Sequence, residues 1–281
     1  MTALPEADAP PPGSPWDDPV AEAPLAFVDL EMTGLDPLKD HVVEICIERW
    51  VGEKRVAHLT SLVMPPSRVG GAAHVHGLDE AALAGAPAFA ALSGDVHALL
   101  DGAVFVAHAA RWDASFLEAE LARVGAPFPI PYYVDTLILA RRAFAFRSYS
   151  LEALTKELAI PRGAAHRAEA DVAALRAVFA RTIAVLAPVS ARDLFQVRIS
   201  ERRARDAILL ACDAAVEHKA PVDVTYRAAR RAPETLTMVL TEVRRDLEPP
   251  RVTGYGLPGR GRRELRADRV LRVEPASRVT E

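Results

Sequence analysis

One stretch, residues 25–36, constrains the fold of this chain more than any other. The apolar run 25–28 predicts a buried strand, and Asp29 and Glu31 follow it at alternate positions. Residues two apart on a strand project to the same side, so both carboxylates point together from its end. Apolar residues resume at 42–47, which predicts a hairpin with both acids at its inner edge. An ordinary pair of solvated acids stays the alternative unless the rest of the chain supplies partners.

The composition predicts two modules behind a disordered tail. The 281 residues are 50% hydrophobic and 26% charged, enough for one large or two modest packed domains. The net charge is −4, yet residues 195–281 contain 18 Lys and Arg against 13 Asp and Glu, so the front is acidic and the back basic. Residues 1–22 are rich in Pro, Ala and acids and predict disorder. We therefore expect a tail over 1–22 and domains over 23–190 and 191–281.

The cysteines and the hydrophobic runs exclude several classes of protein. Cys46 and Cys212 lie far apart without CxxC spacing, so neither a disulfide framework nor a structural zinc site is indicated. The sequence has no apolar run of transmembrane length and no basic N-terminal region before an apolar core. We expect a soluble, cytoplasmic protein without membrane association.

Two further segments place acids at the starts of helices. A buried strand over 104–107 precedes Asp113, which falls in the first turn of a helix and so at the carboxyl edge of the sheet. A carboxylate that only interacts with the helix dipole is an equally common reason for such a position. His166 stands just before a long apolar helix, 172–186, and Asp171 lies at that helix's start. A lone His there is usually structural, so its role depends on whether the acids converge on it.

Four acids and one histidine thus lie at three strand or helix starts: Asp29, Glu31, Asp113, Asp171 and His166. Mg²⁺ and Mn²⁺ prefer oxygen ligands, and two such ions can clamp a phosphodiester for in-line displacement. A neutral histidine nearby can take the proton of the attacking water. The set predicts phosphodiester hydrolysis with two Mg²⁺ or Mn²⁺ ions.

Three motifs resemble those of the DnaQ-like or DEDDh 3′–5′ exonucleases, the group that includes DNA polymerase III epsilon-like nucleases. They are Phe-Val-Asp-Leu-Glu-Met-Thr-Gly at 27–34, Val-Ala-His-Ala-Ala-Arg-Trp-Asp at 106–113 and His-Arg-Ala-Glu-Ala-Asp at 166–171. The resemblance covers roughly residues 25–187. It implies an α/β, ribonuclease-H-like fold, a mixed sheet flanked by helices. It also implies metal binding by the four acids, with His166 as general base.

The second motif departs from the family pattern at two positions. Ala109 stands where the family commonly has Asn, and Trp112 takes the usual place of Phe. That asparagine is not a metal ligand in the family, so we expect altered substrate contacts rather than lost activity. The five core positions are intact, which argues against a non-catalytic copy.

The substrate is left open between DNA and RNA. The sequence Asp-Leu-Glu-Met-Thr-Gly-Leu-Asp at 29–36 also occurs in oligoribonucleases. Three other segments are closer to the polymerase-proofreading exonucleases, namely residues 76–78, 86–89 and 106–108. We expect the protein to act on the 3′ ends of single-stranded DNA, with a polymerase or repair complex as a possible partner. The alternatives are an RNA exonuclease and a non-catalytic protein that binds or senses nucleic-acid ends.

Four side chains are candidates for contact with the terminal nucleotide: Met32, Thr33, His76 and Phe116. Stacking of a base on such a side-chain face would be tolerant of sequence. For Met32 and Phe116, packing in the core is the alternative.

The C-terminal module predicts a small α+β domain. A helical region from 195 to 218 precedes strand-like runs, at 222–226, 236–240, 252–256 and 269–273. These runs resemble the WYL domain, although Arg-Val-Thr stands at 251–253 where that family has Trp-Tyr-Leu. The resemblance implies an Sm-like barrel with an arginine-rich surface that contacts nucleic acid. It assigns phosphate contacts to Tyr226, Arg251, Arg266 and Arg269, and residues 259–263 read as an exposed basic hairpin loop.

Overall fold

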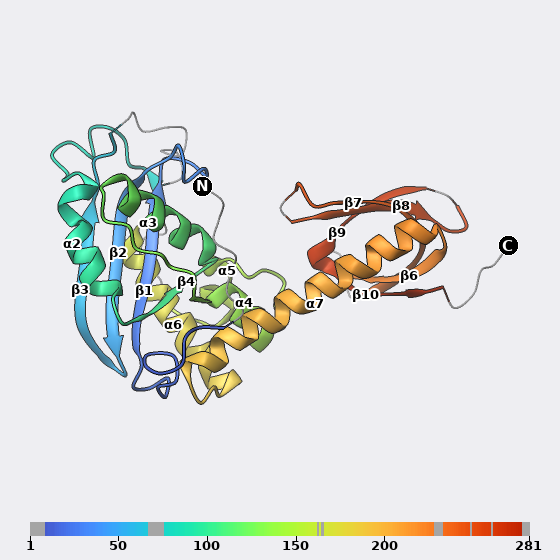
Figure 1. Ribbon diagram of the computed structural model, residues 1–281, viewed down its shortest axis with the longest axis horizontal. Coiled ribbons are helices and arrows are strands. Elements are labelled where there is room, and N and C mark those ends of the chain that lie inside the picture. The colour runs from blue at the N-terminus through green and yellow to red at the C-terminus, as the bar shows by residue number, and fades with distance from the viewer. Residues whose placement is uncertain are drawn as a thin grey trace. The chain divides into compact units, whose positions relative to one another are not determined.

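The structure is a computed structural model, and it divides the chain into two units at Arg198/Ile199 (Figure 1). It describes residues 9–66, 76–161, 163, 166–227, 233–247, 249–259 and 261–276, with the backbone alone for 198–204. The division falls inside one helix, α7 (Ala191–His218), rather than at the predicted boundary of 190/191. Each unit has its own five-stranded sheet.

The first unit contains a mixed sheet with strand order β3-β2-β1-β4-β5. Its strands are β1 (Pro24–Met32), β2 (Val42–Val51), β3 (Lys54–Leu62), β4 (Val104–Ala107) and β5 (Tyr133–Asp135). The hairpin predicted for the first two strands is confirmed, since β1 and β2 pair antiparallel. β1 also pairs parallel with β4. The central strand β1 therefore lies between β2 and β4, and the segment that follows β4 comes close to its C-terminal end.

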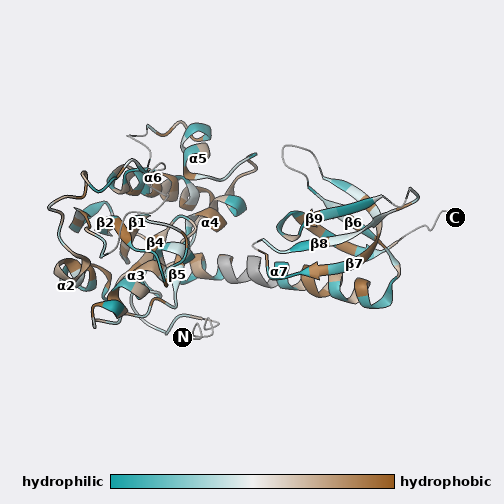
Figure 2. Cartoon of the chain, turned by 90° about the horizontal axis from the view of Figure 1, so that it is seen from above, coloured by the Kyte–Doolittle hydropathy of each residue, from teal (hydrophilic) through white to brown (hydrophobic). Residues whose placement is uncertain are grey.

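Helices accompany this sheet (Figure 1). They are α2 (Phe89–Leu100), α3 (Arg111–Arg123), α4 (Thr136–Ala143), α5 (Leu151–Glu157) and α6 (Ala168–Leu186). Ser150 caps α5, with its side chain accepting from the Ala153 amide. Hydrophobic and hydrophilic residues alternate along α2 and α6 in Figure 2, as expected of helices with one buried face. This arrangement confirms the predicted mixed sheet with flanking helices.

The core of the unit forms because β1 and β2 are apolar on both faces. Val28, Val43 and Ile45 are completely buried, as are Phe116 and Leu117 of α3. A strand covered on both sides reads as a continuous apolar run, which is why 25–28 stands out in the sequence. Polar side chains in such strands are costly to bury, so those that occur there need partners.

The proline-rich N-terminal segment differs from the expected disordered tail over its described part, residues 9–22. Trp16 is 5% exposed and makes edge-to-face contacts with Phe195 and Tyr132, at centroid distances of 5.7 and 6.3 Å. The Arg192 guanidinium donates to the carbonyls of Pro10 and Pro11, both at 2.8 Å. Burial of the Trp16 ring offsets the conformational entropy that the segment loses when it is ordered. The average composition of the segment gives no sign of this contribution.

The second unit contains an antiparallel sheet with strand order β10-β6-β7-β8-β9. Its strands are β6 (Pro221–Tyr226), β7 (Glu234–Arg244), β8 (Arg251–Gly256), β9 (Arg262–Arg266) and β10 (Val270–Pro275), with a 3₁₀ turn η1 (Ala267–Arg269) before the last. β9 has no counterpart among the predicted strands, because its sequence is mostly arginine. β8 and β9 pair antiparallel; of the basic loop expected over 259–263, residues 262 and 263 belong to β9, and residue 260 lies outside the described residues. Closure into an Sm-like barrel stays a prediction.

Among the described residues, no helix combines the length and the apolar character needed to cross a bilayer. The longest of them, α7, has charged residues throughout.

Candidate functional site

The site forms at the end of β1, where the strand's last residues are acidic. Asp29 pairs with Cys46 of β2 and Glu31 with Glu44, and a bulge follows between Glu31 and Met32. Both carboxylates are half-buried. A bulge at a strand end re-aims the side chains beside it, and here it ends the regular pairing directly after the two acids.

Asp113 comes to the same place from α3. It lies in the first turn of that helix, is 7% exposed, and its carboxylate accepts a hydrogen bond from the backbone of Leu30. Leu30 is the residue between Asp29 and Glu31, so Asp113 lies directly against the acidic end of β1. α3 follows β4, which is β1's parallel neighbour, and this topology explains the meeting.

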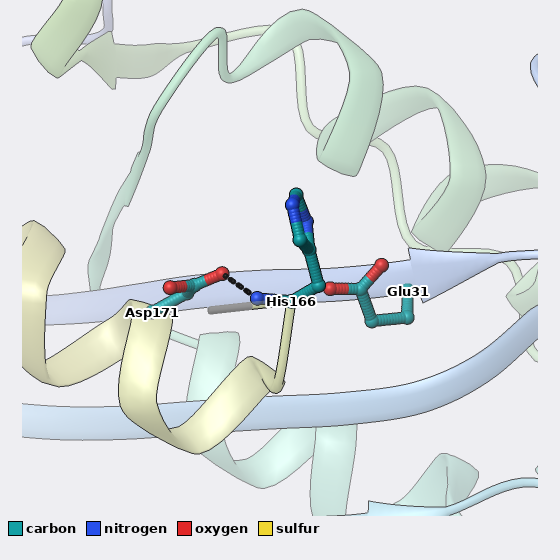
Figure 3. Close-up of side chains that lie close together, drawn as sticks. All are labelled: Glu31, His166 and Asp171. Atoms are coloured by element: carbon teal, nitrogen blue, oxygen red, sulfur yellow. Dashed lines mark hydrogen bonds between the residues drawn. The ribbon is translucent and has the colours of Figure 1, made fainter. Parts of the chain in front are cut away.

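His166 and Asp171 complete the group from the start of α6. The His166 amide donates to the Asp171 carboxylate at 3.1 Å, the dashed contact in Figure 3. His166 has a left-handed backbone (φ +59°) and an exposed side chain, whereas Asp171 is 5% exposed. Ligand atoms of Glu31, His166 and Asp171 all lie within 4.8 Å of one another. The structure thus brings His166 close to Glu31 of β1 and to Asp171 of its own segment, while the role of these residues stays a prediction.

Burial and mutual repulsion make these carboxylates hard to ionise. Removal from water raises the pKa of Asp29 well above its ordinary value, and the charges of Asp113 and Asp171 raise it further. Burial likewise raises the pKa of Asp113. Burial, with the charges of Asp171 and Glu44, raises the pKa of Glu31 to about 7. Such clusters of perturbed acids are typical of functional sites.

An ion pair between the buried Glu44 and the exposed Arg167 borders the site. The Glu44 carboxylate is 2% exposed and accepts from Arg167 Nε and Nη2 at 3.1 and 3.0 Å, and from the Ala168 amide at 3.3 Å. Arg167 follows His166 directly, so this pair fixes the chain beside the histidine. Our sequence analysis missed it, although a glutamate inside the apolar run 42–47 was a usable signal, because a buried acid needs a partner.

The turn after β1 is tightly packed around Asp40. The Asp40 carboxylate accepts from the Thr33 hydroxyl at 3.2 Å and from the Asp36 amide at 2.8 Å. A Cβ on Gly34 would clash with Asp40 Oδ2. The Thr-Gly of the first motif thus shapes a turn in which the Thr33 side chain is 6% exposed and already hydrogen bonded.

The other predicted nucleotide contacts occupy varied positions. Phe116 is fully buried in the core, which is the alternative that the sequence left open. Met32 is half-buried and packs against the same core. His76 is 6% exposed, and its Nδ1 accepts from the Leu78 amide at 3.1 Å. Contact of Met32, Thr33 and His76 with a nucleotide stays a prediction.

Ala109, the departure from the family pattern, lies in a strained turn. Its φ is +60°, a left-handed conformation in which asparagine is favoured over alanine. Its amide donates to Asp135 Oδ1 at 3.0 Å, and the same oxygen accepts from Leu137 at 2.9 Å as the cap of α4. Asp135 therefore holds the turn between β4 and α3 in place.

In the second unit, two of the predicted phosphate contacts are ion-paired. Arg251 lies 3.3 Å from Glu264, and Arg266 lies 2.8 Å from Asp268. Arg251 and Arg266 are direct cross-strand partners, and the hydrogen bond to Asp268, with a smaller contribution from Tyr226, raises the pKa of Arg266. Arg269 is half-buried in η1. The structure thus brings Tyr226, Arg251 and Arg266 together, while their role in binding stays a prediction.

The donor set suits hard divalent cations. Glu31, Asp171 and the His166 imidazole lie within 4.8 Å of one another, with Asp29 and Asp113 at the same end of β1, and oxygen ligands are those that Mg²⁺ and Mn²⁺ prefer. Burial first, and neighbouring carboxylates second, raise the pKa of Asp29, Glu31 and Asp113, and a bound cation would offset both effects. Asp29, Glu31, Asp113 and Asp171 are the residues fitted to hold such ions.

Comparison with known proteins yields one family and several relatives. The family model described as RNase_T, exonuclease, matches residues 26–179. A DNA polymerase III subunit epsilon-like protein of Rhodobacter capsulatus is 38% identical over 179 residues, 59% of this chain and 25% of the relative. The DNA polymerase III subunit epsilon of Treponema pallidum is 28% identical over 160 residues, 56% of this chain and 74% of the relative.

Further relatives show the same region embedded in larger proteins. The 3′-5′ exonuclease DinG of Bacillus subtilis is 28% identical over 177 residues, covering 62% of this chain and 19% of the relative. The chain spans a quarter or less of the length of the first curated relatives it matches. A crystal structure of an E. coli ExoI–ssDNA complex superposes with a TM-score of 0.56 at 19% identity, over 83% of this chain and 54% of that one. At this identity the superposition shows a shared fold.

Proposed function

The chain belongs to the RNase_T exonuclease family, and on that premise we propose that its first unit is a metal-dependent 3′–5′ exonuclease acting on single-stranded DNA. One observation carries the proposal. Acids from three separate elements, β1, α3 and α6, meet at the end of β1: ligand atoms of Glu31, His166 and Asp171 lie within 4.8 Å of one another, and Asp113 accepts from the backbone of Leu30. The names of the relatives, which include DNA polymerase III epsilon and 3′-5′ exonuclease DinG, support the polarity and the preference for DNA.

The reaction we propose is hydrolysis of the last phosphodiester of the strand. Water attacks the phosphorus, the bond to the 3′ oxygen breaks, and a nucleoside 5′-monophosphate leaves a strand shorter by one residue. Two divalent ions held by the four carboxylates would supply Lewis acidity for this displacement.

His166 serves as general base in this proposal. Its ring is exposed, so water can reach it, and its backbone is fixed by the hydrogen bond to Asp171. A ring nitrogen accepts the proton of the attacking water, while solvent protonates the departing 3′ oxygen. Arg167, the next residue, is hydrogen bonded to Glu44 of β2, which anchors the chain directly after His166.

Release of mononucleotides tests the proposal. Wild type is incubated with single-stranded DNA and RNA of one sequence, with Mg²⁺, with Mn²⁺ or with EDTA, and the products are separated by chromatography. We expect nucleoside 5′-monophosphates only with metal, faster from DNA, and a loss of at least about 100-fold for His166→Ala or Asp113→Asn. Arg181→Gln, an exposed site late in α6, is the control. Faster release from RNA would favour the oligoribonuclease alternative, and no release with either metal would favour an end-binding protein.

A further inference from the structure

A second feature of the first unit is a basic, aromatic segment, residues 141–149. The sequence from 136 to 151 contains Arg141, Arg142 and Arg147 and no Asp or Glu, within a half of the chain that is acidic overall. The same segment contains three aromatic residues, Phe144, Phe146 and Tyr149. Arginines interleaved with aromatic rings are the composition of surfaces that bind single-stranded nucleic acid.

The 141–149 segment is folded so that its rings are ordered. Phe144 and Phe146 stack with ring centroids 5.1 Å apart and planes 16° apart, and both are half-buried. The Tyr149 hydroxyl donates to the Phe144 carbonyl at 2.8 Å and accepts from the Phe146 amide at 3.1 Å. The Arg141 guanidinium lies 6.0 Å from the centroid of the Tyr149 ring. Parallel rings held in this way offer a formed face to a planar ligand at little entropic cost.

Hydrogen bonding places this segment at the same edge of the sheet as the acids. The Tyr149 carbonyl accepts from His108 Nε2 at 2.9 Å, while His108 Nδ1 lies 3.0 Å from the Thr136 hydroxyl. Val106 of β4 pairs with Phe27 of β1. His108 directly follows the end of β4, and Asp29 lies two residues beyond Phe27 on the parallel neighbour β1, so both lie at the same edge of the sheet. The 141–149 segment is thus tied to the edge of the sheet that carries the acids.

We propose that the 141–149 segment binds the single strand just upstream of the reacting 3′ end, an inference that rests on the proposed function for the identity of its ligand. Bases stack on the Phe144–Phe146 pair, and the exposed Arg142 and Arg147 contact phosphates. The charge of the segment suits the strand, since the acids of the site repel it until cations are bound. Stacking gives binding without sequence preference.

Binding in the absence of hydrolysis tests this segment separately from the chemistry. Anisotropy of a fluorescein-labelled dT12 strand is measured in EDTA over a series of salt concentrations. We expect Phe146→Leu to weaken binding about tenfold and Phe146→Tyr to keep it within about twofold, because only the aromatic face matters. Arg142→Gln with Arg147→Gln should lower the salt slope by about 0.7 for each phosphate that the protein no longer neutralises. Arg181→Gln, which removes one positive charge from α6 outside the segment, should match wild type.

A second readout separates binding from support of the site. Hydrolysis of the p-nitrophenyl ester of thymidine 5′-monophosphate needs the acids but no upstream strand, so the arginine double variant should hydrolyse it at the wild-type rate. Equal losses on this ester and on the strand would overturn the proposal, as would unchanged dT12 binding by all variants. If wild type hydrolyses neither substrate and these variants still weaken dT12 binding, the segment proposal stands and the proposed function fails.

Discussion

Replacing Glu31 with glutamine should stabilise the first unit while abolishing its activity. Glu31 is partly buried among Asp171 and Glu44, and its pKa is raised from 4.5 to about 7. Ionising such a carboxyl in the folded chain costs about 3 kcal/mol at pH 8. Because water reaches part of Glu31 and screens the repulsion, we expect Glu31→Gln to raise the free energy of unfolding by about 1–2 kcal/mol at pH 8. Glutamine removes the charge and nearly keeps the shape.

The direction of the pKa shift determines the pH range in which Glu31→Gln stabilises the unit. With a pKa raised in the folded state, Glu31 favours folding below its unfolded pKa near 4.5, and this contribution is lost as the pH rises through about 7. The stabilisation by Glu31→Gln should therefore be small at pH 5 and complete at pH 8, both in EDTA. Saturating Mn²⁺ should stabilise wild type more than the variant, because a bound ion relieves the same repulsion.

Tryptophan fluorescence during urea unfolding measures the effect on the correct unit. All three tryptophans, Trp16, Trp50 and Trp112, belong to the first unit, so the signal is insensitive to unfolding of the second. Glu53→Gln, an exposed site after β2, is the control and should change stability by less than about 0.5 kcal/mol. A Glu31→Gln protein no more stable than wild type at pH 8 in EDTA would refute the crowding of charge on which the site assignment depends.

Three further substitutions test the supports of the site, each by urea unfolding. Arg167→Met leaves the buried Glu44 with only the Ala168 amide as a partner and should cost about 1–2 kcal/mol, whereas adding Glu44→Gln should recover part of that loss; no recovery would show that the two side chains do not interact. Gly34→Ala forces its Cβ against Asp40 and should cost about 1–3 kcal/mol, and an unchanged midpoint would contradict the tight turn. Ala109→Gly relieves a left-handed backbone and should stabilise by about 1 kcal/mol, while destabilisation would argue against φ +60°.

The positions of the candidate acids could be predicted from the sequence, whereas the contacts that support them could not. Asp29, Glu31 and Asp113 were predictable because they follow apolar strands, and strand ends that lie side by side collect whatever polar residues follow them. Phe116 was ambiguous, since helical spacing alone does not say whether an aromatic side chain faces the core or a ligand.

The remaining supports depend on contacts between distant segments. Glu44 and Arg167 are 123 residues apart, and nothing local to either residue shows that they meet. Trp16 was predicted to lie in a disordered tail because composition measures average hydrophobicity, whereas a single ring with two aromatic partners can hold a segment in place. The strand β9 was not predicted because three of its five residues are arginines, so it lacks an apolar strand pattern. It forms a strand through backbone pairing with β8, which lies on a different segment.

The direction of degradation tests the central claim most directly. Single-stranded DNA labelled at its 5′ end is incubated with Mg²⁺ and either wild type or Asp29→Asn, after urea unfolding has shown that the variant is folded. We expect wild type to give a ladder that shortens from the 3′ end one nucleotide at a time, and Asp29→Asn to leave the strand intact. A strand cut internally, or a ladder that Asp29→Asn produces as fast as wild type, would contradict the assignment of the β1 acids as the catalytic centre.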